Sequence, residues 1–270
     1  MDFLQYWNLK EKPFENTGDP KFFYYSPEHK EALVRLIYVI RQNKAGALLA
    51  GDYGTGKTTI ANELLAEVEE SRNYQSVYIS NPLLNPEELL QEIVYQLSGN
   101  AESLGRLQAR RAIDDLLQDI ASRGDYSIII VDEAHLITQK EVLEELRLMM
   151  NLQYKNRFLV TLIMMGQLEL REIINSQPQF KQRFAICYML QHLNEEETIG
   201  YIKHRMKIAG AERRIFTDEA SSFIYNSSSG KPRQINNICD MSLLVGYMRQ
   251  ADEIDGHIVR DVSKDLGEEI

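Results

Sequence analysis

The stretch GDYGTGKTT, residues 51–59, has the composition and spacing of a phosphate-binding loop. It fits the pattern G-x-x-x-x-G-K-[ST] and lies between an apolar segment and a helical pattern. Gly54 and Gly56 would let the backbone curl around phosphate oxygens that a side chain would obstruct. We therefore predict that backbone N–H groups of this loop bind the phosphates of a nucleotide.

Two side chains of the loop carry further chemistry. Lys57 would bring a positive charge to the β- and γ-phosphates, and the Thr58 hydroxyl would ligate Mg²⁺. ATP and Mg²⁺ are the cofactors that we expect. The predicted contacts of the loop are Gly51, Asp52, Tyr53, Gly54, Thr55, Gly56, Lys57, Thr58 and Thr59.

The second chemical motif is IIIVDEAH at residues 128–135. Asp132 ends a β-branched run, at the edge where open α/β sheets bind ligands, and its carboxylate would hold Mg²⁺. Glu133 would orient and polarise the attacking water. As an alternative, Asp and Glu together also favour the start of a helix. His135 fits a packing or capping role as well as a role in the site.

Both motifs require a sheet that presents strand ends at one edge. The sequence indicates strands at 46–51, 76–80, 126–132, 157–165 and 185–190. Helical patterns occur at 26–43, 57–70, 85–99 and 104–124, with Ser26 and Asn85 as N-caps. This alternation predicts an α/β fold with a parallel five-stranded sheet and helices on both faces.

After about residue 190 the strand signals stop. Helical patterns follow at 194–210, 217–230, 232–250 and 255–266, with the N-caps Asn194, Thr217 and Asp255. We therefore predict two domains. Residues 1–190 form a nucleotide-binding core that includes an N-terminal extension at 1–25, and residues 191–270 form a small all-helical lid.

Composition limits the classes of protein that fit. The 270 residues carry a net charge of −10, which argues against a surface that coats nucleic acid. RLQARR at 106–111 is a candidate basic patch or a solvated helix face. The two cysteines form no cluster, no apolar run is long enough for a membrane span, and the N-terminus lacks the features of a signal peptide. We expect a cytoplasmic protein.

In this order, the motifs resemble a AAA+ ATPase, and in particular the ExeA/GspA type of secretion and pilus systems, including MshM-like forms. The resemblance covers essentially the whole chain. It is carried by SPEHKEAL near the N-terminus, GDYGTGKTT, VDEAH, MMGQLELR, FKQRF, YIKHRMKIAG and GKPRQINNICD. It implies a P-loop AAA+ core followed by the helical lid.

The resemblance implies roles for three more residues. Arg233 in GKPRQIN matches the sensor 2 arginine, which reaches the nucleotide phosphates from the lid; a plain loop-to-helix junction is the alternative. Arg183 in FKQRF matches the arginine finger that acts on a neighbouring subunit's ATP, although a surface arginine fits too. Gln167 matches sensor 1, which positions water or the γ-phosphate. Residues 22–25 and 13–14 would line the adenine or pack against the core.

The resemblance is compatible with three functions, which differ in what the ATPase acts on. The first is an ATPase that couples nucleotide-dependent self-assembly to a secretion, pilus or envelope machine, in the cytoplasm or at the inner membrane through a partner protein. The second is a DNA-binding regulator of the MuB or TniB transposition-helper kind, which the acidic charge disfavours. The third is a nucleotide-gated switch with slow turnover, which the intact Asp132–Glu133 pair disfavours.

Overall fold

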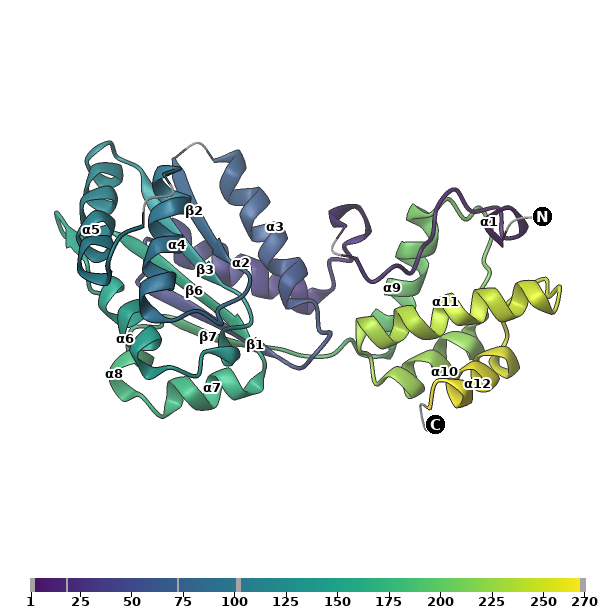
Figure 1. Cartoon of the computed structure of the whole chain (residues 1–270). Helices are drawn as coiled ribbons and strands as arrows, with labels where there is room; N and C mark the ends of the chain where they lie inside the picture. The colour runs from purple at the N-terminus through teal and green to yellow at the C-terminus, as the bar shows by residue number, and fades with distance from the viewer. Residues whose placement is uncertain (1–2, 18, 72, 101–102, 268–270) are drawn as a thin grey trace. The chain divides into compact units, whose positions relative to one another are not determined.

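The computed structural model describes residues 3–17, 19–71, 73–100 and 103–267 (Figure 1). It divides into two compact units. The sheet unit consists of Glu31–Gly51 and Ile60–Leu190, and the helical unit consists of Met1–Lys30, Asp52–Thr59 and Gln191–Ile270. The predicted division placed residues 1–25 with the sheet, whereas here they belong to the helical unit together with the phosphate-binding loop.

The sheet unit is built on five parallel strands, as predicted. Their order is β2-β3-β6-β1-β7, so that β1 lies between β6 and β7. All five strands therefore end at the same edge. The strands are β1 (Gly46–Gly51), β2 (Tyr74–Ile79), β3 (Tyr126–Val131), β6 (Val160–Gly166) and β7 (Ile186–Leu190).

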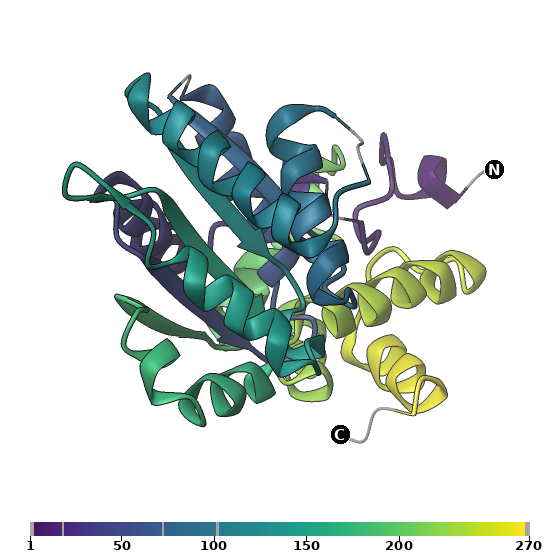
Figure 2. The same cartoon turned by 60° about the vertical axis from the view of Figure 1, so that its left-hand side comes forward.

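Helices cover both faces of this sheet (Figures 1 and 2). Because β3 is buried on both sides, it is apolar at consecutive positions, with Ile129 and Val131 facing one core and Ile128 and Ile130 facing the other. The first core also contains buried residues of α4 (Pro86–Ser98), α5 (Arg106–Ser122), α6 (Lys140–Met149), α7 (Leu168–Asn175) and α8 (Pro178–Lys181). The opposite face carries the parts of α2 (Pro27–Arg41) and α3 (Lys57–Glu70) that belong to this unit.

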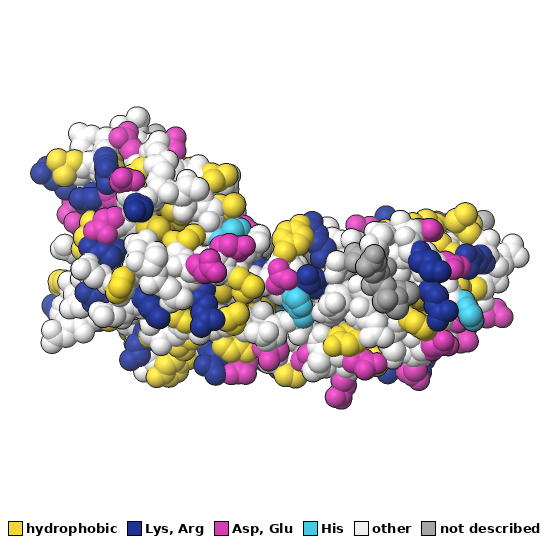
Figure 3. Space-filling view, turned by 90° about the horizontal axis from the view of Figure 1, so that it is seen from below, with side chains coloured by type: hydrophobic (Ala, Val, Ile, Leu, Met, Phe, Trp, Pro, Cys, Tyr) yellow, Lys and Arg dark blue, Asp and Glu magenta, His cyan; other side chains and the backbone are white. Residues whose placement is uncertain are grey.

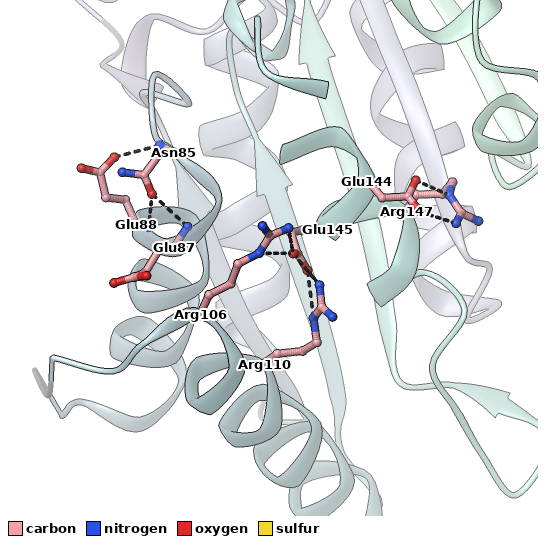
Figure 4. A network of polar contacts seen from close by, with 8 residues as sticks. All are labelled: Asn85, Glu87, Glu88, Arg106, Arg110, Glu144, Glu145 and Arg147. Carbon is pink, nitrogen blue, oxygen red and sulfur yellow. Dashed lines mark hydrogen bonds and ion pairs between the residues drawn. The ribbon is translucent and has the colours of Figure 1, made fainter. Parts of the chain in front are cut away.

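A buried carboxylate joins α5 to α6 (Figure 4). Glu145 is 1% exposed, and its oxygens accept hydrogen bonds from Arg106 and Arg110 at 2.5–3.1 Å. The pKa of Arg110 is raised, first by this hydrogen bond. The Arg106 and Arg110 side chains remain 46% and 42% exposed, so this part of α5 is a solvated helix face on which two of the arginines are paired with Glu145.

One predicted strand is divided in two. The segment 157–165 begins as β5 (Arg157–Phe158), which pairs in an antiparallel hairpin with β4 (Gln153–Tyr154), and β6 starts only at Val160. Lys155 and Asn156 form the turn with φ values of +48° and +64°, as in a two-residue hairpin of the I′ type. The hairpin, α6, α7, α8 and the short helix η2 (Ala134–Leu136) are not among the predicted elements.

The helical unit contains α9 (Glu195–Ile208), α10 (Asp218–Ser228), α11 (Pro232–Met248) and α12 (Gly256–Asp265). Asn194, Thr217 and Asp255 are N-caps, as the sequence indicates, and each side chain accepts a backbone N–H. A parallel bridge pairs Phe216 with Ile254.

The N-terminal segment packs onto these helices. It contains α1 (Phe3–Tyr6) and η1 (Pro20–Phe22). Trp7 is 1% exposed, and its indole N–H donates to the carbonyl of Leu243 at 2.9 Å. Arg205, itself buried, donates to the carbonyls of Pro13 and Glu15 and lies over the Phe22 ring at 4.9 Å. The segment is therefore part of this unit's core.

None of the described helices is long and apolar enough to cross a membrane. Figure 3 shows one face of the surface, on which acidic and basic side chains are interspersed.

Candidate functional site

The phosphate-binding loop follows β1 and takes a conformation that requires its glycines. Gly54 and Gly56 have φ values of +75° and +96°, a region that L side chains rarely adopt. A Cβ at Gly56 would lie 2.8 Å from Nε2 of His29, and one at Gly54 would lie 3.2 Å from Cβ of Arg233. Both glycines are thus needed for their backbone angles and for the close approach of neighbouring side chains.

The side chain of His29 is hydrogen-bonded to the backbone of the loop. It is 5% exposed; its Nε2 lies 2.9 Å from the carbonyl oxygen of Thr55, and its Nδ1 lies 2.6 Å from Oγ of Ser26. Because a carbonyl only accepts, Nε2 carries the proton and Nδ1 accepts from the Ser26 hydroxyl. Burial lowers the pKa of His29, which keeps the ring neutral. The sequence around His29 gives no local signal of its contact with the loop.

Lys57 points back along its own loop. It is 6% exposed, and Nζ donates to the carbonyl oxygen of Asp52 at 2.9 Å. The hydroxyl of Thr55 donates to the same oxygen at 2.8 Å. The ammonium is therefore held at the loop, and phosphate oxygens are the stronger acceptors that would compete for it.

The carboxylate of Asp52 contacts three polar groups of the helical unit. Its Oδ2 lies 3.1 Å from Nζ of Lys231 and 3.2 Å from Nε2 of His192, and its Oδ1 accepts the N–H of Tyr53 at 2.7 Å. The hydrogen bond from the N–H of Tyr53 is the largest cause of the lowered pKa of Asp52. Of the other contacts that lower this pKa, the one with Lys231 comes next. Lys231 is thus an ion-pair partner of the loop.

Arg233 stands in the first turn of α11, directly after Pro232. Its guanidinium lies over the ring of Tyr53 at 5.1 Å from the centroid, and Nη1 donates to the Tyr53 hydroxyl. The structure therefore brings this predicted phosphate ligand to the loop itself. The planar, fork-shaped guanidinium suits phosphate oxygens.

A small cavity lies beside the loop within the helical unit. Its volume is about 50 Å³, and Thr59 of α3 contributes to its wall. The other lining residues are Thr17, Asp19, Phe22, Phe23, Tyr24, His29, Tyr201, Arg205 and Pro232. Three of the four aromatic residues at 22–25 therefore line it, whereas Phe14 packs in the core of the unit.

The acid pair lies in the sheet unit, at the end of β3. Asp132 is 2% exposed; its Oδ1 accepts the N–H of Glu133 at 2.8 Å and its Oδ2 accepts the hydroxyl of Tyr78 at 3.2 Å. Burial, followed by the Asp132 charge, raises the pKa of Tyr78, so this hydroxyl stays a donor. Tyr78 comes from the neighbouring strand β2, and nothing in the sequence around it predicts this contact.

Glu133 has an unusual backbone conformation. Its φ and ψ are +48° and +32°, a left-handed conformation that costs a non-glycine residue about 1–3 kcal/mol and that gathers at active sites. Its Oε2 atom is buried and, among the described residues, accepts no hydrogen bond. That oxygen is available to accept a proton donor such as water.

Gln167, the residue matching sensor 1, follows β6 as the N-cap of α7. Its backbone N–H donates to Nδ1 of His135 at 3.3 Å, and the same Nδ1 lies 3.3 Å from Oε2 of Glu133. The strand order places β3 and β6 side by side, which is why residues distant in sequence meet here. His135 is thus part of this cluster.

Arg183 follows α8 in the sheet unit and is exposed. Within the part of the chain that the structure describes, its side chain makes no hydrogen bond or ion pair. By contrast, Arg171 contacts the sulfur of Met189 at 2.8 Å. Arg183 therefore has a free charged group at the surface of its unit.

The metal-ligating side chains of the site suit Mg²⁺ better than they suit a metal ion that is bound by protein ligands alone. In the described ranges there is no group of three or more His, Cys, Asp or Glu side chains that could hold a metal ion. Mg²⁺ usually takes one or two carboxylates, with phosphate oxygens and water completing its shell. Asp132 and Thr58 are oxygen donors of that kind.

Comparison with known proteins agrees with this arrangement. Residues 40–174, half of the chain, match the AAA domain family. The chain belongs to the AAA domain family. The matched region includes the phosphate-binding loop, the acid pair and Gln167, whereas Arg183 and Arg233 lie beyond it.

This AAA domain is similar to General secretion pathway protein A of Aeromonas hydrophila, with 35% identity over 258 residues. The match covers 93% of this chain and 46% of that protein, so the chain spans about half of its relative's length. The resemblance to the ExeA/GspA type is confirmed by this match.

Solved structures show the AAA+ fold. Cdc6p from Pyrobaculum aerophilum has a TM-score of 0.72 at 18% identity, covering 92% of this chain and 71% of that one. The ORC2 protein of Aeropyrum pernix has a TM-score of 0.70 at 15% identity, with 95% and 71% covered. At these identities the likeness concerns the fold alone.

Proposed function

We propose that this AAA domain binds ATP with Mg²⁺ and hydrolyses it. The observation that carries this proposal is the acid pair at the end of β3. Asp132 is fixed by two hydrogen bonds, and the adjacent Glu133 keeps one buried carboxylate oxygen without a donor. A nucleotide-gated switch with slow turnover would not need a general base held in a left-handed backbone conformation.

Each residue has a defined role in this mechanism. The loop N–H groups and Lys57 bind the phosphates, and Arg233 leaves the Tyr53 hydroxyl for a phosphate oxygen. Mg²⁺, when bound through Thr58 and Asp132, would neutralise charge on the β- and γ-phosphates. Glu133 accepts a proton from the attacking water, and Gln167 helps to place that water or the γ-phosphate.

The cavity that Phe22, Phe23 and Tyr24 line is the proposed place of the adenine. It borders Thr59, the last of the predicted contacts of the loop and the neighbour of the predicted Mg²⁺ ligand Thr58. At about 50 Å³ it has to widen when a base enters, and Arg205 and Tyr201 are among the residues that line it.

Hydrolysis is tested by phosphate release from ATP with Mg²⁺ and with EDTA. We expect release only with Mg²⁺, and none from Lys57→Ala, which removes the ammonium from the loop. The matched control is Lys203→Ala, an exposed lysine of α9. Equal release by Lys57→Ala and wild type would mean that a contaminating enzyme or another site is responsible.

Self-assembly is the second part of the proposal. Arg183 is exposed and unpaired in the described chain, as expected for a residue that acts on a neighbouring subunit's nucleotide. A delivered arginine contributes about 10³–10⁵-fold to the rate in other NTPases. The rate per subunit should therefore rise with protein concentration in wild type and stay flat in Arg183→Ala; Arg171→Ala is the control.

We further propose that the chain serves a bacterial secretion or pilus machine through a protein partner, in the cytoplasm or at the inner membrane. The support is the 35% identity to General secretion pathway protein A. Light scattering of Glu133→Gln with Mg-ATP, with and without duplex DNA at physiological salt, tests it against the transposition-helper alternative. Assembly that needs no DNA is expected, and assembly that appears only with DNA would contradict the proposal.

The comparisons give the transposition alternative no support, and the structure removes one argument for it. Of the basic residues at 106–111, Arg106 and Arg110 are bound to Glu145. Their charge is therefore partly neutralised within the sheet unit, and the net charge of the chain is −10. A duplex-binding surface would need unpaired cations facing the phosphates.

A further inference from the structure

His135 lies between the two strand ends that carry Glu133 and Gln167. Its side chain is 11% exposed, and its Nδ1 is 3.3 Å from the N–H nitrogen of Gln167 and 3.3 Å from Oε2 of Glu133. The ring is therefore in reach of both residues. All three belong to the sheet unit.

The chemistry of these atoms decides which contact is a hydrogen bond. The backbone N–H of Gln167 only donates, so Nδ1 accepts and its lone pair is used. A neutral imidazole then carries its proton on Nε2, and Nδ1 has none to give to Glu133. This agrees with the finding that Oε2 of Glu133 accepts no hydrogen bond in the described chain.

The end of β6 is shaped to admit this ring. A Cβ added at Gly166 would lie 3.1 Å from the backbone nitrogen of His135, 3.2 Å from its Nδ1 and 3.0 Å from Cδ2 of Leu170. Such contacts are tighter than ordinary van der Waals packing. The φ of Gly166 is not in the left-handed region, so the glycine is required here for space and not for its backbone angles.

We propose that His135 is a positioning residue for hydrolysis. Its Nδ1 accepts the N–H of Gln167 and so keeps that donor away from the carboxylate of Glu133. Oε2 of Glu133 is then left for the attacking water, and the sensor residue stays at a fixed distance from the base. The inference rests on the proposed ATP hydrolysis, which it deepens.

Three substitutions separate acceptor chemistry from packing. His135→Ala removes both, His135→Phe keeps the ring volume without an acceptor, and His135→Asn places an amide oxygen near the position of Nδ1. We expect kcat to fall about tenfold or more in His135→Ala and His135→Phe, since a positioned base contributes roughly 10²–10⁴-fold to the rate. The Asn variant should recover much of the loss.

Nucleotide affinity is the readout that a general folding defect would move. We expect the Kd for a fluorescent ATP analogue and the thermal midpoint to stay near wild type in all three variants, because the phosphate-binding loop is untouched. Full activity of His135→Phe, or an equal loss in Phe and Asn, would overturn the proposal. Gly166→Ala, which presses on the ring, should lower kcat in the same way.

Amide hydrogen exchange at Gln167 tests its hydrogen bond to Nδ1 of His135 without any need for turnover. We expect faster exchange in His135→Phe than in wild type, and protection again in His135→Asn. Unchanged exchange in His135→Phe would show that His135 does not hold the N–H of Gln167. If wild type releases no phosphate with Mg²⁺, the proposed hydrolysis fails, and the exchange experiment still decides whether His135 holds Gln167.

Discussion

The two clusters of candidate residues are built in different ways. In the phosphate-binding loop, the conformation of consecutive residues forms the site, and two glycines with positive φ make that conformation possible. In the acid cluster, Tyr78, Asp132 and Gln167 come from the ends of three different strands. A contiguous backbone site is therefore sensitive to a single added Cβ, whereas the acid cluster is sensitive to the loss of individual side-chain atoms.

The largest expected effect is in the acid cluster. Glu133→Gln keeps the shape of the side chain but removes the base, so we expect turnover to fall by about 10²–10⁴-fold, the usual contribution of a general base. Steady-state phosphate release measures this, with Glu141→Gln on the exposed face of α6 as the control. Wild-type turnover of Glu133→Gln would remove Glu133 from the mechanism.

Gly56→Ala tests the loop by the opposite kind of change, an added atom. The new Cβ would meet Nε2 of His29 at 2.8 Å in a backbone region that costs a non-glycine residue about 1–3 kcal/mol. We expect nucleotide affinity to fall about tenfold or more. Fluorescence titration measures this, with Gly105→Ala as the control because a Cβ there meets no atom closer than 3.6 Å. An unchanged Kd would show that the loop tolerates a side chain.

The contact between α5 and α6 can be broken at Glu145. Glu145→Ala leaves the Arg106 and Arg110 guanidiniums without their acceptor, and hydrogen bonds to charged groups are worth about 1.5–3 kcal/mol. We expect the free energy of unfolding of the sheet unit to fall by roughly that amount in urea titrations followed by circular dichroism. The neighbouring exposed pair Glu144–Arg147 is the control: Glu144→Ala should change it by less than about 0.5 kcal/mol. Equal effects of the two substitutions would contradict this reading of Figure 4.

Tyr78→Phe removes one hydrogen bond from Asp132 and adds no atom. Because the carboxylate loses a partner that fixes it at 3.2 Å, the Mg²⁺ concentration for half-maximal turnover should rise about threefold to tenfold, corresponding to roughly 1 kcal/mol. Tyr95→Phe, on an exposed tyrosine of α4, is the control. The same Mg²⁺ requirement in both variants would separate Tyr78 from the metal site.

The smallest effect concerns His29 and the pH. Its folded pKa is lowered below the ordinary value of about 6.5, so the unfolded chain binds a proton that the folded chain does not. The stability of the helical unit should therefore be full above about pH 6.5 and fall as the pH drops below it, by at most about 1.4 kcal/mol per pH unit. Trp7, the single tryptophan, reports this unit by fluorescence.

The control for this pH dependence is His257, which is exposed on α12. His29→Gln should flatten the decline in stability between pH 6.5 and about pH 5, whereas His257→Gln should leave it in place. If the decline survives in His29→Gln, another group is responsible for it.

The strands and the loop could be predicted from sequence because their signals are local. Gly54 and Gly56 follow a fixed spacing, and the IIIVD run marks a strand buried on both faces. The N-caps Asn85 and Asn194 are also local, since each side chain caps the helix that it begins. Such features depend on residues a few positions apart.

The remaining contacts depend on the strand order, which no short stretch encodes. His135 meets Gln167 only because β3 and β6 are neighbours, and Tyr78 meets Asp132 only because β2 and β3 are. The ion pair between Lys231 and Asp52 likewise joins residues far apart in sequence, so the signals around Lys231 could indicate only an exposed cation.

The central claim is that the loop binds the nucleotide and the acid cluster hydrolyses it. The most direct test measures, in the same samples of Lys57→Ala and Glu133→Gln, the Kd for Mg-ATP and the single-turnover rate of its cleavage at saturating protein. We expect Lys57→Ala to lose affinity by roughly tenfold to a hundredfold. Glu133→Gln should bind like wild type and cleave at a small fraction of its rate. A Glu133→Gln variant that loses affinity as Lys57→Ala does, or cleaves at the wild-type rate, would contradict the account.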